Sequence, residues 1–112
     1  MITPSNKHTE KELQRHADKV AALRLAVLHS AGTTDHVTRN LAFSGGQLPA
    51  PLYEYVTKIR GTASYRITDD DINNLLAAGY SQDAIFEITI AAALGAATQQ
   101  LESGLAALKE AD

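Results

Sequence analysis

Residues 84–98 read AIFEITIAAALGAAT, a run in which Glu87 is the only ionisable side chain. Alanine is the best helix former, and no alternation of apolar and polar residues indicates a strand here. A helix that is apolar on every side has to be covered on every side. We therefore expect an all-α fold, a compact bundle of about five helices, in which this segment is the central helix and lies partly at a contact between subunits of a homo-oligomer.

Gly95 lies in the middle of this run. A glycine inside a helix costs about 1 kcal/mol relative to alanine unless close packing offsets the loss. We therefore expect another backbone to approach the helix at Gly95.

Cap residues divide the chain around this helix. Thr68 precedes three aspartates, which suit the positive end of a helix dipole, and Gly79 is a typical residue just beyond a helix end. Ser81 then starts the last helix, which we expect to run to about Leu108.

The first helix is expected to begin at Thr9, where Glu12 completes a capping box, and to end near Ser30. Its first half is rich in charged residues, whereas Arg24 is the only charged residue in 20–28. The second half of the helix is therefore expected to enter a core. Residues 1–8 are then a flexible N-terminal tail and residues 9–112 a single domain.

Two shorter helices are expected between these segments. One begins at Thr34 and ends at the Gly45-Gly46 turn, and the next opens at Pro49 and Pro51. In the second of them the side chains on one face have helical spacing and should be buried: Leu52, Tyr55, Val56 and Ile59.

Composition excludes several classes of function. The chain has no cysteine, which rules out disulfides, thiolate metal sites and thiol catalysis. Its formal charge of −3 gives no general attraction to nucleic acid or anionic lipid. The first residues lack the apolar core of a signal peptide, and no segment approaches the roughly 20 apolar residues of a membrane span, so a cytoplasmic protein with no membrane partner is expected.

Residues 75–85 also fit the spacing of a DNA-binding helix-turn-helix. The second helix would then present Gln82, Asp83 and Glu87 to the DNA, and its first basic residue is Lys109. Carboxylates are repelled by phosphates, so no nucleic-acid partner is expected.

Glu87 is the first candidate for a functional residue. A carboxylate in an apolar run is either protonated or paired, and no basic residue lies three or four positions away on the same helix. Its partner is therefore expected on another helix or subunit, and the basic candidates are Arg24, His29, Arg39, Arg60 and Arg66. A raised pKa would suit a general acid or base. A structural ion pair and a solvent-facing side chain are the alternatives.

The histidines do not form a metal-binding motif. His29 ends the first helix and His36 follows the turn, so the two are close enough along the chain to meet. No HExxH pattern, P-loop or dinucleotide-binding motif is present, and we expect neither a metal nor a cofactor.

Residues 67–105 read ITDDDINNLLAAGYSQDAIFEITIAAALGAATQQLESGL. This segment resembles the C-terminal half of the alkylhydroperoxidase D-like and carboxymuconolactone decarboxylase superfamily. The matching positions are Thr68, Asp71, Ile72, Leu75, Ala78, Gly79, Tyr80, Ser81 and Ile85. The resemblance implies an all-α fold that forms obligate oligomers.

The departures from the family pattern limit what the resemblance implies about activity. The peroxidase-type cysteines are absent, Gln99 and Gln100 stand where many members have Asn-Arg, and residues 1–50 do not align. We therefore expect a cysteine-less member that is not a thiol peroxidase.

Whether this member is an enzyme stays open. One hypothesis is acid/base chemistry on a small organic substrate, with Glu87 as acid or base and His29, His36 or Tyr65 assisting. The alternative is a non-catalytic oligomeric scaffold or small-molecule-binding module in which Glu87 has a structural role.

Overall fold

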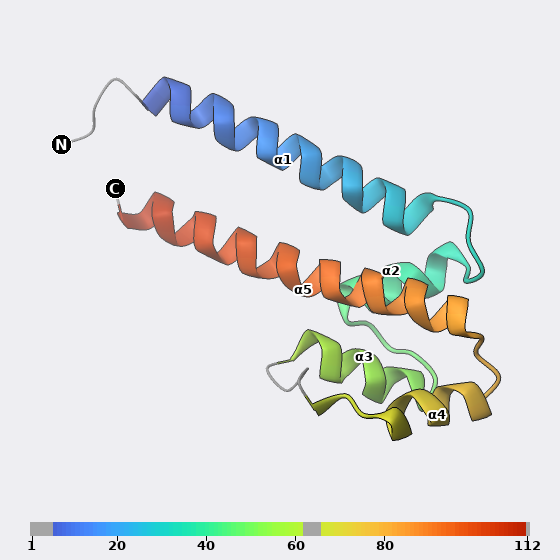
Figure 1. Cartoon of the computed structure of the whole chain (residues 1–112). Coiled ribbons are helices and arrows are strands. Elements are labelled where there is room, and N and C mark those ends of the chain that lie inside the picture. The colour runs from blue at the N-terminus through green and yellow to red at the C-terminus, as the bar shows by residue number, and fades with distance from the viewer. Residues whose placement is uncertain (1–5, 62–65, 112) are drawn as a thin grey trace.

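The computed structural model of the chain describes residues 6–61 and 66–111, and in these ranges it contains five α-helices and no strand (Figure 1). The helices are α1 (Asn6–His29), α2 (His36–Ser44), α3 (Leu52–Arg60), α4 (Asp69–Ala77) and α5 (Gln82–Ala111). The expected all-α fold with a long last helix is confirmed.

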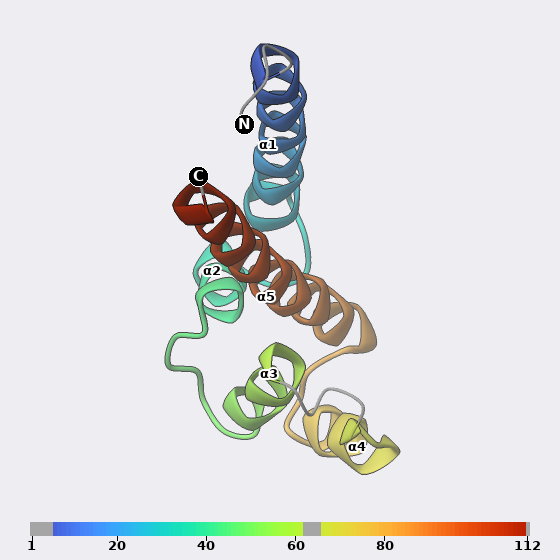
Figure 2. The same cartoon turned by 90° about the vertical axis from the view of Figure 1, so that its left-hand side faces the viewer.

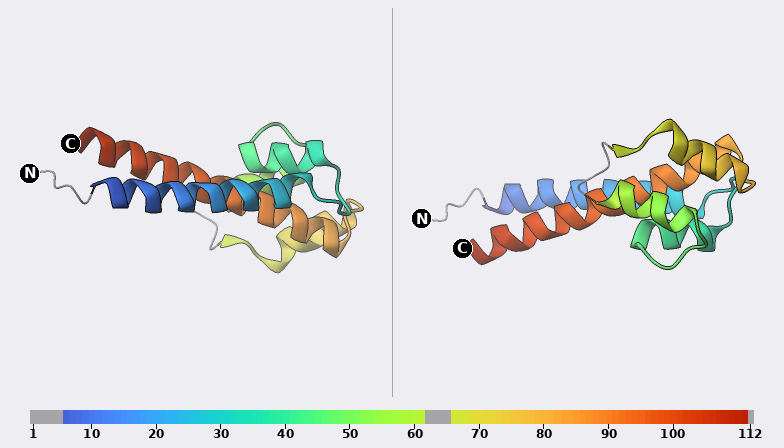
Figure 3. Two further views of the ribbon diagram at one scale, coloured as in Figure 1. Left: turned by 90° about the horizontal axis from the view of Figure 1, so that it is seen from above. Right: turned by 90° about the horizontal axis from the view of Figure 1, so that it is seen from below.

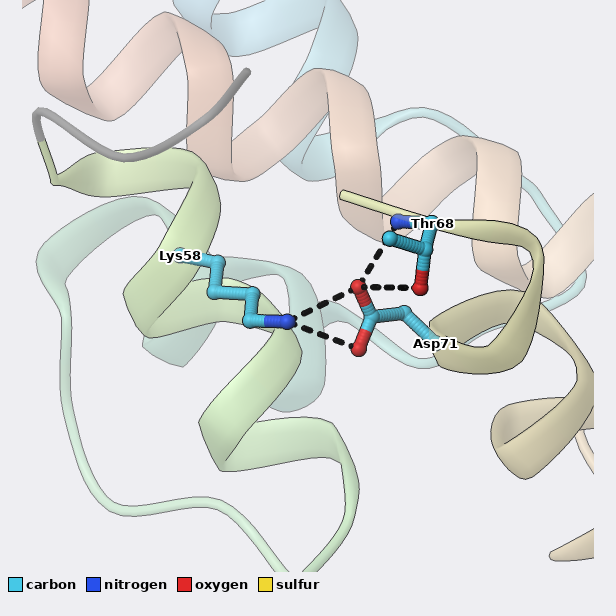
Figure 4. A network of polar contacts seen from close by, with 3 residues as sticks. All are labelled: Lys58, Thr68 and Asp71. Atoms are coloured by element: carbon cyan, nitrogen blue, oxygen red, sulfur yellow. Dashed lines mark hydrogen bonds and ion pairs between the residues drawn. The ribbon is translucent and has the colours of Figure 1, made fainter. Parts of the chain in front are cut away.

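The start of α4 is fixed by a polar network that also joins it to α3. The backbone N–H of Thr68 donates to Asp71 Oδ2 at 2.9 Å, and Lys58 Nζ donates to both carboxylate oxygens of Asp71 at 2.9 Å (Figure 4). The Thr68 N–H, followed by the Lys58 ammonium, lowers the pKa of the Asp71 carboxyl below its ordinary value. Thr68 is therefore the N-cap, as predicted.

The turn between α4 and α5 also follows the sequence pattern. Gly79 has a φ of 101°, and the N–H of Tyr80 donates to the carbonyl of Leu75 at 3.1 Å, which is the Schellman arrangement. Ser81 Oγ accepts the N–H of Ala84 at 3.1 Å and caps α5. The predicted roles of Gly79 and Ser81 are confirmed.

Three predicted helix ends are shifted. α1 begins at Asn6, so Thr9 and part of the expected tail lie inside the helix, and α5 continues past Leu108 to Ala111. The N-cap of α2 is Asp35, whose carboxylate accepts the N–H of Thr38 at 2.7 Å. Thr34, the expected cap, has its hydroxyl bonded elsewhere, as described below.

The core lies along one side of the first half of α5. The helices α2 and α3 pack along this half, and α4 lies at its start (Figure 2). The buried hydrophobic residues are Leu28, Ala42, Leu48, Leu52, Tyr55, Val56, Ile59, Leu75, Ala84, Ile85, Ile88, Ala91 and Ala92. They include the whole predicted face of α3.

Helices α2 and α5 approach each other closely at Gly95. A Cβ placed on Gly95 would lie 1.9 Å from the carbonyl oxygen of Phe43 and 2.4 Å from Nη1 of Arg60. The guanidinium of Arg60 in turn donates to the Phe43 carbonyl and, at 3.1 Å, to Oε1 of Gln99. The close neighbour expected at Gly95 is therefore confirmed.

The second half of α5 leaves the core together with α1. The two helices run antiparallel, and the start of α1 lies at the same end of the molecule as the end of α5 (Figures 1 and 3). No described residue is buried in 10–26 of α1 or in 96–111 of α5. We call these two segments the arm. The expectation that residues 20–28 enter a core is correct only for the last turn of α1, where Leu28 is buried.

The arm makes the molecule long. Its extents are 57 × 29 × 21 Å and its radius of gyration is 17.1 Å, whereas a compact chain of this length has about 13 Å. The helices are thus a bundle around the first half of α5 and a two-helix extension beyond it.

Candidate functional site

Glu87 holds the loop between α1 and α2 against α5. Its Oε2 accepts the backbone N–H of Thr33, and its Oε1 accepts both the backbone N–H and the hydroxyl of Thr34, each at 2.8 Å. The carboxylate is therefore paired, as one of the expectations required, but with backbone amides and a hydroxyl rather than with a basic side chain.

Gly32 makes room for this contact. A Cβ at Gly32 would lie 2.8 Å and 2.9 Å from the two carboxylate oxygens of Glu87. Any other residue would push the carboxylate away from the amides that follow. The close approach of the Glu87 carboxylate to the loop therefore requires a glycine at position 32.

These contacts decide the ionisation of Glu87. The N–H groups of Thr33 and Thr34 lower the pKa of the Glu87 carboxyl from 4.5 to about 2, because both stabilise the charged form. The raised pKa that would suit a general acid or base is not found. At neutral pH the side chain is an anion that accepts three hydrogen bonds from the loop between α1 and α2, and so fixes this loop to α5.

Arg39, on α2, holds the end of α1. Its side chain is buried, and its guanidinium donates to the carbonyl of Val27 at 2.8 Å and to that of Ser30 at 2.6 Å. These carbonyls belong to the last turn of α1 and the residue after it, which lack partners within the helix. Sequence reasoning named Arg39 only as a partner for Glu87 and missed this role.

Arg39 and Glu87 line one shallow cavity of about 250 Å³. Val27 from α1 and Phe86 and Ile90 from α5 complete its apolar wall. Neither His29 nor His36 lines this cavity, so it does not unite the proposed acid or base with its proposed assistants.

The two histidines do meet each other. Their ring centroids are 5.9 Å apart and the rings are nearly perpendicular, as their spacing predicted. Tyr65, the third proposed assistant, lies outside the described residues. Within residues 6–61 and 66–111 no group of three His, Asp or Glu side chains is placed to hold a metal ion.

A second candidate surface runs along the outer side of α5. Seven exposed residues repeat every three or four positions, so they share one face of the helix: Phe86, Ile90, Ala93, Ala97, Leu101, Gly104 and Leu108. We call this face the α5 stripe. None of its residues is polar or charged, and it extends over about 33 Å. Sequence reasoning expected α5 to be apolar all round but did not separate this face from the buried one.

The length and composition of α5 also match those of a membrane-crossing helix. An 18-residue window of α5 has a mean hydropathy of 1.2, and 33% of it is buried within the fold. The expectation that no segment approaches a membrane span is therefore too strict. The buried part packs on α2 and α3, as in the core helix of a globular domain.

Replacement of Glu87 by Gln is expected to lower the free energy of unfolding by about 1–3 kcal/mol at pH 7, because an amide cannot accept from both Thr33 and Thr34 on two oxygens. The folded pKa of about 2 lies below the unfolded value near 4.5, so the stabilisation is complete above pH 4.5 and is lost as the pH falls toward 2. Urea unfolding at several pH values measures this difference.

The exposed Asp83, one turn earlier on α5, provides the control as Asp83→Asn. The difference in unfolding free energy between wild type and Glu87→Gln should become smaller as the pH falls from 5 to 2. The unfolding free energy of the control should depend on pH as that of wild type does. A difference in unfolding free energy that stays constant over this range would show that the contacts with the loop do not lower the pKa of Glu87.

No protein-family model, no curated protein sequence and no solved structure matches this chain.

Proposed function

We propose that this chain is a self-assembling helical module, a homo-oligomeric scaffold without a catalytic site, and that the α5 stripe is its assembly surface. The observation that carries the proposal is the exposure of this stripe. Phe86 and Leu108, at its two ends, are 65% and 64% exposed. A contiguous apolar surface of this length on a monomer is typical of an interaction site.

The total surface of the chain supports the proposal. Its accessible area is 7734 Å², whereas a compact monomer of 12.0 kDa has roughly 6,000 Å². The excess is larger than the roughly 800 Å² that each partner buries in a standard interface. Association along the arm would remove this excess from water.

Gly104 supports the same conclusion. A Cβ on Gly104 would meet nothing within 4 Å, so no contact inside the chain offsets the cost of a glycine in mid-helix. Gly95, nine residues earlier, has such a contact in Phe43. A partner that packs closely on the arm would explain the glycine at position 104 in the same way, because a larger residue there would clash with it.

The geometry at Glu87 favours assembly over acid/base catalysis. Both carboxylate oxygens accept hydrogen bonds from the loop, and a carboxylate with a pKa of about 2 is a weak base at neutral pH. We further propose that the chain is a cysteine-less member of the alkylhydroperoxidase D-like superfamily. The capping residues of its motif, Thr68, Gly79 and Ser81, support this membership by acting as caps.

A charge on the α5 stripe tests the proposal. Leu101→Glu is expected to weaken self-association by on the order of 100-fold, because burying an unpaired carboxylate in an apolar contact costs several kcal/mol. Ser103→Glu is the matched control, since Ser103 is exposed on α5 but lies off the stripe. Sedimentation velocity of both variants measures the dissociation constants, and circular dichroism monitors helix content.

The control should associate like wild type, and Leu101→Glu should be monomeric at concentrations where wild type is not. Equal association of the two variants would exclude the α5 stripe as the assembly surface.

A further inference from the structure

We infer that two copies of the chain pair through antiparallel α5 helices, with the two-fold axis passing at Ala97. This inference rests on the proposed self-assembly and adds the partner face, direction and register. It begins from the spacing of the α5 stripe. Counted from Ala97, the other six residues lie at 4, 7 and 11 positions before it and at 4, 7 and 11 positions after it.

This symmetry lets the stripe face itself when one copy is reversed. In an antiparallel pair centred at Ala97, Ile90 of one chain faces Gly104 of the other, and Ala93 faces Leu101. Ala97 faces its own copy at the axis. The large residues Ile90 and Leu101 are thus each opposite a small residue, which allows the two helices to pack closely near the axis.

The ends of the stripe fit the same register. Phe86 faces Leu108 of the second copy, so the two most exposed apolar side chains of α5 cover each other. The open space at Gly104 receives Ile90, whose side chain is 39% exposed in the single chain. The excess surface and the unexplained glycine are therefore accounted for by one contact.

A parallel pair in register does not have this fit. It would place Phe86 on Phe86 and Leu101 on Leu101, while Gly104 would face a second glycine. Large residues would then hold the helices apart where the small ones leave voids. The helix dipoles also oppose a parallel pair and favour an antiparallel one.

The first helix extends the same surface. Val27 shares a cavity wall with Phe86 and Ile90, and Leu23, one turn earlier on the same side of α1, is 52% exposed. A two-fold axis perpendicular to both α5 helices places the α1 helices of the two copies on the same side of the pair. Because residues 98–111 of one α5 then lie beside residues 83–96 of the other, the arm of each copy packs along the first half of the other copy's α5.

The charges on α5 favour a protein partner over a lipid surface. The helix carries four acidic residues and one basic residue, Lys109. Helices that lie on membranes are typically rich in Lys and Arg on their polar face, because these bind anionic headgroups. A second copy requires no such charge, since the stripe itself is uncharged.

Disulfide trapping tests the register, and the chain suits it because it contains no cysteine. Single cysteines are placed at Ala93, Ala97 and Leu101, and Ser103→Cys, off the stripe, controls for random collisions. After mild oxidation, Ala97→Cys is expected to form a covalent dimer. The Ala93→Cys and Leu101→Cys chains are expected to link poorly alone, because each residue lies about 12 Å along the axis from its own copy. When mixed, with one chain carrying a mass tag, they are expected to link to each other.

Three results would overturn the inference. Self-linking of Ala93→Cys and Leu101→Cys as readily as Ala97→Cys would indicate a parallel pair. A wild-type dimer in sedimentation whose Ala97→Cys variant links no faster than Ser103→Cys would place the contact on another surface, leaving self-assembly intact. Monomeric wild type that floats with vesicles of phosphatidylcholine and phosphatidylglycerol would assign the stripe to lipid and end both proposals.

Discussion

Gly95→Ala is expected to lower the free energy of unfolding by about 3 kcal/mol, the largest effect of a single methyl group in this chain. The new Cβ would lie 1.9 Å from the Phe43 carbonyl oxygen, which is a backbone atom and cannot rotate away. Either α2 has to move off α5 or Arg60 has to leave the Phe43 carbonyl. The helix-propensity gain of alanine, about 1 kcal/mol, offsets only part of the loss.

Gly104→Ala is the matched control for this substitution. The added methyl group meets nothing within the chain, so the same change should here stabilise by about 0.5–1 kcal/mol. Both glycine variants are best compared in the Leu101→Glu background, where association does not contribute to stability. Urea unfolding should give changes of opposite sign, and a destabilisation of similar size at both positions would contradict the close crossing at Gly95.

Arg39→Met is expected to cost about 2–4 kcal/mol, the second large effect. Methionine retains an unbranched, flexible side chain but donates no hydrogen bond, so the carbonyls of Val27 and Ser30 lose their guanidinium partners. Because the hydrogen bonds of Arg39 to these carbonyls hold the end of α1 on α2, α1 should lose helix content before the core unfolds. Circular dichroism during urea unfolding detects this early loss.

Arg39→Lys is the control for this substitution, because it shortens the reach of the side chain but keeps a hydrogen-bond donor. Lysine keeps a charge and can reach one carbonyl, so its loss of stability should be smaller than that of methionine. If Arg39→Met unfolds as a single transition within 0.5 kcal/mol of wild type, the anchoring role of Arg39 is wrong.

Local signals predicted much of the fold. Thr68, Gly79 and Ser81 act through backbone groups within a few residues of themselves, so their roles can be recognised in the sequence. The buried face of α3 follows from helical spacing in the same way. The predicted N-cap of α2, Thr34, is one residue too early, because Thr34 and Asp35 are both good caps. The hydroxyl of Thr34 instead donates a hydrogen bond to Glu87, which is distant in the sequence.

The candidate site was harder to predict because its partners are backbone groups. Glu87 was recognised from its apolar surroundings, and its pairing was anticipated. Backbone amides are the same in every residue, however, so no side-chain pattern pointed to Thr33 and Thr34. The carbonyls bound by Arg39 were hidden for the same reason.

The α5 stripe was concealed by its composition. Alanine and glycine occur on both the buried and the exposed faces of α5, so the contrast between the faces is weak. Only the positions of α2 and α3 show which face the fold covers, and the other face then becomes visible as a continuous apolar surface.

Sedimentation velocity of the wild-type chain over a wide concentration range tests the central claim most directly. The account predicts a reversible increase from the chain mass of 12.0 kDa to twice that value as the concentration rises. A chain that sediments as a monomer at every concentration, with the α5 stripe still exposed to water, would contradict it.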